Sequence, residues 1–121
     1  FCFYICSIVI DSKFPFRRFF DAADIADDSQ RTAAMQEHAR DLTKHIDALA
    51  KREYHKSDSS PDFVVLFLPF ESLLSEALRA DSKILDHAFS KQVTLATPST
   101  MLALLHSVSL VFRRTELAKN A

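Results

Sequence analysis

The sequence predicts an α/β domain with a mostly parallel or mixed sheet. Three short apolar segments, at residues 1–11, 63–68 and 92–96, have the length and the composition of buried strands. The stretches that follow them carry apolar residues at helical spacing. Strands that alternate with helices are typical of this fold class, and a chain of 121 residues is long enough for one hydrophobic core.

The first strand is expected to end before Pro15, because proline lacks a backbone donor. The spacing of apolar residues then predicts a helix over 16–28 and a long amphipathic helix from about Gln30 to Tyr54. His38 and His45 on the long helix are seven residues apart, whereas helical metal ligands are usually four apart. We therefore expect a structural or surface role for both histidines.

Polar residues 55–61 separate the long helix from the second strand, which Pro69 closes. The apolar spacing predicts a further helix over 71–80. Asp81 or Ser82 is suited to cap a shorter helix that precedes the third strand.

The last predicted helix follows the third strand, where Thr97 suits the cap and Pro98 suits the first helical position. It is expected to run to about Glu116. Because this helix is apolar nearly all round, we expect it to be buried, either within the domain or against a partner. Residues 115–121 form a polar tail.

One short stretch, Asp11-Ser12-Lys13, carries residues suited to phosphodiester chemistry. If the first strand continues through it, Asp11 and Lys13 project from the same face, about 7 Å apart. A carboxylate beside an ammonium group can hold a divalent metal and polarise a phosphodiester. The alternative is a strand that merely ends in polar residues, and the same tripeptide recurs at Asp81-Ser82-Lys83, where a helix start is expected.

The net charge of −1 and the pI of about 6.6 exclude a protein whose whole surface is a nucleic-acid footprint. Contacts with DNA must come from local clusters, each of which is also typical of a solvated surface. The clusters are Arg17-Arg18, Lys51-Arg52 and Arg113-Arg114.

The start of the last helix is a second candidate for a phosphate contact. Thr97, Ser99 and Thr100 lie at a helix N-terminus, where free N–H groups and the helix dipole favour anions. Plain capping by the hydroxyl groups is the alternative, and the one we favour. Glu71 after Pro69 is read as an acidic residue in the first turn of its helix, or else as a polar group at the sheet edge.

Cys2 and Cys6 would lie about 13 Å apart on one strand, which is too far for a disulfide bond. They are typical of small apolar residues in a reducing compartment. The apolar run from Phe1 to Ile10 is about half the length that spans a bilayer. We therefore expect a cytoplasmic protein, with a membrane anchor upstream as an open alternative.

Several of these segments, in this order, resemble the RmuC family of bacterial DNA recombination proteins. The resemblance runs from about Ser7 to Arg114. It rests on Val9-Ile10-Asp11-Ser12-Lys13-Phe14-Pro15, on a helical insertion that contains His38 and His45, on Pro61-Asp62-Phe63-Val64-Val65-Leu66-Phe67-Leu68-Pro69 followed by Glu71, and on Leu95-Ala96-Thr97-Pro98-Ser99-Thr100-Met101-Leu102-Ala103-Leu104-Leu105.

The resemblance implies a restriction-endonuclease-like fold of the PD-(D/E)xK type: a mixed sheet with flanking helices and a long helical insertion at about 16–56. It implies that residues 1–114 are the C-terminal part of a nuclease-like domain. The absence of glycine and the start within an apolar run also predict a fragment of a larger domain. The family's coiled coil, and self-association through it, would lie upstream.

The resemblance further implies a DNA recombination protein that limits rearrangement between repeats, with Mg²⁺-dependent DNA endonuclease activity. Asp11 would be catalytic and bind the metal, and Lys13 would be catalytic. The second acidic ligand would come from a strand before Phe1, and we assign no metal role to Asp62. DNA is the expected partner, and no small-molecule cofactor is expected. The alternatives are a non-catalytic DNA-binding or scaffolding domain on the same fold, and a packing or oligomerisation module.

Overall fold

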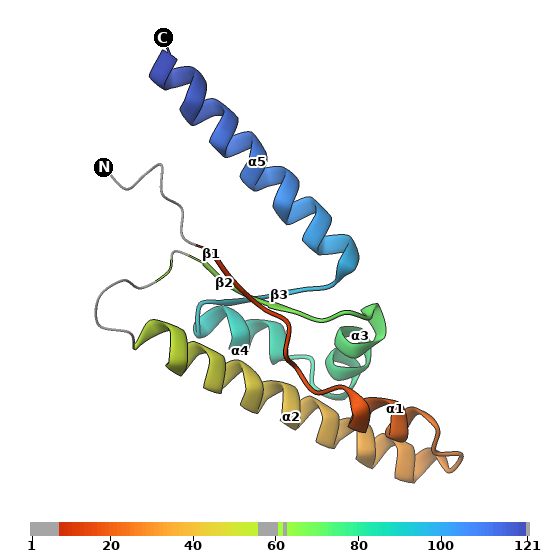
Figure 1. The fold of residues 1–121 in the computed structure, drawn as a ribbon. Coiled ribbons are helices and arrows are strands. Elements are labelled where there is room, and N and C mark those ends of the chain that lie inside the picture. The colour runs from red at the N-terminus through yellow and green to blue at the C-terminus, as the bar shows by residue number, and fades with distance from the viewer. Residues whose placement is uncertain (1–7, 56–60, 62, 121) are drawn as a thin grey trace.

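The computed structural model describes residues 8–55, 61 and 63–120. The elements are β1 (Ile8–Asp11), α1 (Arg17–Ala23), α2 (Asp28–Tyr54), β2 (Phe63–Phe67), α3 (Glu71–Ala80), α4 (Ile84–Ser90), β3 (Val93–Ala96) and α5 (Pro98–Asn120) (Figure 1). The predicted order of strands and helices is confirmed for these residues. Cys2, Cys6, Asp62 and most of the polar segment at 55–61 lie outside the described residues.

The three strands form one sheet in the order β1-β2-β3, and both pairs are parallel. The sequence predicted a mostly parallel or mixed sheet and the resemblance implied a mixed one; the described strands are all parallel. The restriction-endonuclease-like fold stays a prediction, because three parallel strands do not distinguish it from other α/β folds. Asp11 pairs in register with Leu66, and Leu66 pairs with Leu95, so the three side chains share one face of the sheet.

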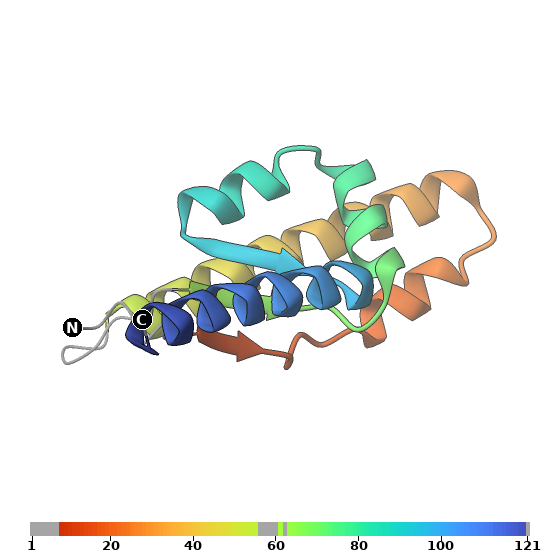
Figure 2. The same ribbon diagram turned by 90° about the horizontal axis from the view of Figure 1, so that it is seen from above.

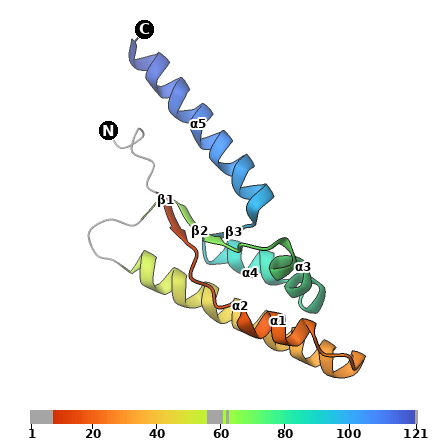
Figure 3. The same ribbon diagram turned by 45° about the vertical axis from the view of Figure 1, so that its right-hand side comes forward.

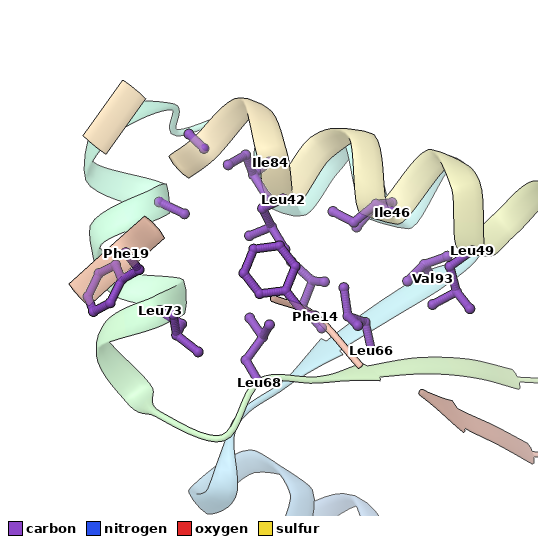
Figure 4. Packing of buried hydrophobic residues seen from close by; sticks show 14 of the residues in the cluster. Phe14, Phe19, Leu42, Ile46, Leu49, Leu66, Leu68, Leu73, Ile84 and Val93 are labelled. Carbon is purple, nitrogen blue, oxygen red and sulfur yellow. The ribbon is translucent and has the colours of Figure 1, made fainter. Parts of the chain in front are cut away.

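Helices α2, α3 and α4 cover that face, and α1 packs against α2 (Figures 1 and 3). The core lies between the sheet and these helices (Figure 4). Its largest fully buried aliphatic side chains come from α2, from β2 with the residues after it, and from α3 and α4: Leu42, Ile46, Leu49, Leu66, Leu68, Leu73 and Ile84. The apolar stripe that the sequence predicted on the long helix is thus the stripe that packs on the sheet.

Helix α2 begins where the sequence supplies a cap. The Asp27 side chain accepts a hydrogen bond from the Gln30 amide at 2.9 Å. The predicted start at Gln30 is therefore two residues late. At the other end Tyr54 donates its hydroxyl hydrogen to the Gln92 carbonyl oxygen at 2.8 Å, which joins the end of α2 to the start of β3.

A turn without glycine precedes β3. Gln92 has a φ of 61°, in the left-handed region that glycine normally occupies. The chain contains no glycine, and we expected Asn, Asp, Ser and Pro to take over its positions. At this turn a glutamine does so instead.

Helix α5 leaves the end of β3 and extends away from the sheet on the side opposite α2 (Figures 1 and 2). Of the two ways in which it was expected to be buried, cover within this domain does not occur among the described residues, since Leu102 is 72% exposed and Leu117 is 70% exposed, and cover by a partner stays a prediction. The helix touches β3 near its start and continues beyond Arg114 into the polar residues, to Asn120. None of the helices in the described part of the chain combines the length and apolar character that crossing a bilayer requires.

Candidate functional site

The acidic residue at the end of β1 is buried rather than open to solvent. Asp11 is 8% exposed and faces α2. Its Oδ2 accepts a hydrogen bond from Arg52 Nη2 at 2.5 Å. Its Oδ1 accepts one from the Lys13 amide at 2.9 Å and lies 3.7 Å from His45 Nε2. Both carboxylate oxygens therefore already have cationic or N–H partners from this chain.

Lys13 is not on the strand, because β1 ends at Asp11. The chain turns there, so the expected arrangement of the two side chains on one strand face is wrong. What binds Asp11 is the backbone N–H of Lys13, and the Lys13 side chain is exposed. The second copy of the tripeptide has the same geometry, since the Lys83 amide donates to Asp81 Oδ1 at 3.0 Å. Asp-Ser-Lys thus forms the same Asx turn twice, which is a local property of the sequence.

The Asp11 carboxyl has a lowered pKa. Burial by itself raises the pKa, but the hydrogen bonds from the Lys13 amide and from Arg52, together with the charges of Arg52 and His45, outweigh burial. The group is therefore ionised at neutral pH.

We expect the stability difference between the wild-type chain and an Asp11→Asn variant to narrow at low pH. In the folded chain the pKa of Asp11 lies below its ordinary value of 3.8. Between these two pH values Asp11 is more protonated in the unfolded chain than in the folded chain, so the free energy of unfolding rises with pH there. The contribution of the ionised Asp11 to the free energy of unfolding is complete at a pH above its pKa in the unfolded chain. It is lost as the pH falls through the pKa of Asp11 in the folded chain. Urea unfolding between pH 6 and pH 2.5 measures the difference. A difference that stays constant over this range would contradict the assignment.

Three residues of α2 at seven-residue spacing lie along the segment from β1 to α1. His38 is 2% exposed, its Nε2 lies 2.8 Å from the Leu73 carbonyl oxygen, and its ring contacts Phe19 with centroids 4.9 Å apart. His45 contacts the Phe14 ring edge-on, with centroids 5.4 Å apart. Arg52 completes the series at Asp11. The structural role expected for His38 is confirmed.

A surface hollow of about 610 Å³ opens beside this stripe. It is formed by the segment after β1, by α1 and by the middle of α2. Its lining residues are Phe14, Pro15, Arg17, Arg18, Asp21, Asp41, Lys44, His45 and Ala48. His45 lines this hollow and also lies beside Asp11. One of the predicted DNA-binding clusters, Arg17-Arg18, is therefore close to Asp11.

The cations of the hollow differ in what they contact. Arg18 Nη1 donates to both carboxylate oxygens of Asp41, at 3.0 and 3.2 Å, so its charge is compensated. Arg17 and Lys44 are exposed, and within the described part of the chain neither has a salt-bridge partner. These two side chains are the ones free to meet an anion. Sequence reasoning overlooked Lys44, because only the packing of α1 against α2 brings it to Arg17.

The start of α5 is occupied by an acidic side chain of the same chain. Glu71 Oε1 accepts hydrogen bonds from the Ser99 amide at 3.0 Å and from the Ser99 hydroxyl at 2.8 Å. The bond from Thr97 and those from Ser99 lower the pKa of Glu71. Thr100 Oγ1 accepts from the Thr97 amide at 2.8 Å. A phosphate contact at Thr97, Ser99 and Thr100 stays a prediction, and a phosphate there would have to compete with Glu71.

Glu71 lies in the first turn of α3, as favoured from the sequence. Its second role, as the acid that caps α5, joins residues 28 positions apart. No local pattern indicates that contact.

Arg113 and Arg114 are exposed and remote from the other candidates. The rise of an α-helix places them about 22 Å along α5 from Pro98. The structure thus groups Asp11, Lys13 and Arg17-Arg18 near one another and leaves the Arg113-Arg114 pair apart. Among the described residues, no group of three or more His, Cys, Asp or Glu side chains is arranged to hold a metal ion.

Comparison with known proteins gives a consistent result. The model of the RmuC family matches residues 6–121. The chain is 36% identical over 115 residues to the DNA recombination protein RmuC homolog of Zymomonas mobilis, an alignment that covers 94% of this chain and 26% of the relative. It is 35% identical over 111 residues to the homolog of Chlamydia muridarum, covering 92% of this chain and 25% of that relative.

A third relative, the DNA recombination protein RmuC homolog of Vibrio cholerae, is 33% identical over 119 residues, which cover 94% of this chain and 23% of the relative. The chain thus spans about a quarter of the length of these relatives. No solved structure matches the chain significantly.

Proposed function

The chain belongs to the RmuC family, and from this premise we propose that it forms a DNA-contacting part of a DNA recombination protein. The proposal is supported by the names of the relatives and by one structural observation: Arg17 and Lys44, two cations without salt-bridge partners in the described part of the chain, line one hollow. The activity and the partners of the whole protein are part of the same proposal.

The hollow suits a DNA backbone better than a small ligand. Its cationic side chains are exposed, and long basic side chains that neutralise phosphates provide most of the affinity of sequence-independent DNA binding. The exposed Arg18–Asp41 pair links α1 to α2 inside the hollow, with Arg17 on the α1 side and Lys44 on the α2 side. Two uncompensated cations predict weak binding with a moderate dependence on salt.

Replacing both Arg17 and Lys44 with glutamine is expected to weaken duplex DNA binding by this chain about tenfold at 50 mM salt. Each lost phosphate contact removes a released counterion, so the slope of log K against log salt should fall by about 2. Fluorescence anisotropy with a labelled 20-base-pair duplex, over a salt series, measures both quantities.

The matched control is the variant with Arg113→Gln and Arg114→Gln, which loses the same net charge at the far end of α5. It should bind nearly as the wild type does. Equal losses in the two variants would mean that net charge, or the Arg113-Arg114 cluster that the sequence also predicted, contributes as much to the binding as the hollow, and would contradict the proposal. A wild-type chain that does not bind DNA at low salt would refute the proposal for this part of the protein.

The resemblance also implies Mg²⁺-dependent cleavage, with Asp11 as metal ligand and Lys13 as a catalytic residue. Asp11 does lie at the carboxyl end of a parallel strand, where α/β proteins commonly bind ligands. The described residues do not form a Mg²⁺ site by themselves, because both Asp11 oxygens have partners and Arg52 places a positive charge at the carboxylate. Cleavage of plasmid DNA in Mg²⁺ that is lost in Asp11→Asn would make this second function the better one.

A further inference from the structure

Asp11, which the resemblance assigns as a metal ligand, is paired with the guanidinium group of Arg52 in the structure. Asp11 and Glu53 are both buried, at 8% and 6% exposure. Arg52 contacts each of them: its Nη2 lies 2.5 Å from Asp11 Oδ2, and its Nε lies 3.2 Å from Glu53 Oε2. One guanidinium group therefore bridges a carboxylate at the end of β1 and a carboxylate on α2.

We infer that Arg52 takes the place of a divalent cation at Asp11, and that Asp11 serves as the internal anchor that holds β1 to α2. A buried carboxylate needs a cationic partner or hydrogen-bond donors, because transfer out of water is costly for a charge. Arg52 supplies the charge and the Lys13 amide supplies a donor. No further ligand is required for the carboxylate to stay ionised.

The surroundings of Asp11 agree with an anchor. Its register partner Leu66 is fully buried, so the carboxylate lies at the margin of the hydrophobic core, beneath α2. His45 Nε2 is buried and lies 3.7 Å from Asp11 Oδ1, and among the described residues it has no hydrogen-bond partner. A guanidinium with a second buried carboxylate as neighbour is held in place from both sides. A Mg²⁺ ion, which keeps several of its waters and takes few protein ligands, would have to displace it in order to bind Asp11 directly.

Thermal unfolding of this chain tests the inference through a double-mutant cycle. Arg52→Gln and Asp11→Asn are each expected to lower the Tm by about 5 °C. The Tm of the double variant is expected to be close to the Tm of either single variant, because each substitution breaks the same pair. The Arg52 side chain is 53% exposed, so its replacement is not expected to prevent folding. Lys13→Gln is the matched control, since only the Lys13 backbone contacts Asp11, and it should leave the Tm unchanged.

The same scan is then repeated with 10 mM MgCl₂ or MnCl₂. If Asp11 is an anchor paired with Arg52, the metal is expected to change the Tm of the wild-type chain no more than it changes the Tm of Asp11→Asn. A rise of several degrees in the wild type that is absent in Asp11→Asn would show that the carboxylate binds the metal and would overturn the inference. Additive effects of Arg52→Gln and Asp11→Asn would overturn it as well. These readouts are independent of DNA binding by the hollow.

Discussion

Replacing Leu66 with alanine is expected to lower the free energy of unfolding by about 3 kcal/mol. Leu66 is fully buried in β2, the central strand, and pairs with Asp11 on one side and Leu95 on the other. Its side chain packs toward α2 (Figure 4). The truncation removes buried apolar surface and leaves a cavity that strands paired on both sides cannot close easily. Urea unfolding followed by circular dichroism measures the loss.

The matched control is Leu102→Ala on α5, the same substitution at a side chain that is 72% exposed. It should change the stability of this chain by less than about 0.5 kcal/mol. A similar loss in both variants would mean that α5 folds against the sheet in solution, contrary to the arrangement in Figure 1.

Replacing His38 with alanine is expected to cost about 2–3 kcal/mol of stability and to leave the affinity for DNA unchanged. The ring is 2% exposed and packs between Phe14 and Phe19, and its Nε2 bonds to the Leu73 carbonyl oxygen on α3. The substitution creates a cavity and removes the hydrogen bond between the imidazole and that carbonyl oxygen. Urea unfolding and the anisotropy assay measure the two effects.

His106→Ala on the exposed surface of α5 serves as the control and should be close to neutral. If His38→Ala lost DNA binding while keeping its stability, the histidine would be functional rather than structural. That outcome would contradict the role assigned to it here.

The strands and most helices could be predicted because each has a local cause. The continuous apolar run of β2, the helical spacing on α2 and the placement of Pro98 at the first position of α5 act over a few residues, and the structure confirms all three. For α5 the sequence left open whether this domain or a partner covers it, because an apolar composition says that a helix needs cover but not which surface supplies it, and the described part of this domain does not.

The candidate site was less predictable. The Asp-Ser-Lys motif indicated a pair of side chains on one strand, but the Asx turn at Asp11 and the end of β1 direct the Lys13 side chain elsewhere. The contacts that define the site join residues far apart in sequence: Arg52 with Asp11, 41 positions apart, and Ser99 with Glu71, 28 positions apart. The seven-residue spacing of His38 and His45 continues to Arg52, and this is the one pattern in the sequence that points to Arg52. By itself the spacing argued only against a metal site formed by the two histidines.

The sequence by itself determined the α/β class, the order of the elements and the family, because periodicity, capping and motif order are properties of neighbouring residues. Only the tertiary structure decided the partners of Asp11, the acid that occupies the start of α5 and the joining of Arg17 with Lys44. Those depend on how α1, α2 and α3 pack against the sheet. Packing places charges from distant segments within a few ångströms of one another, and at that range a neighbouring guanidinium or amide decides what a carboxylate can bind.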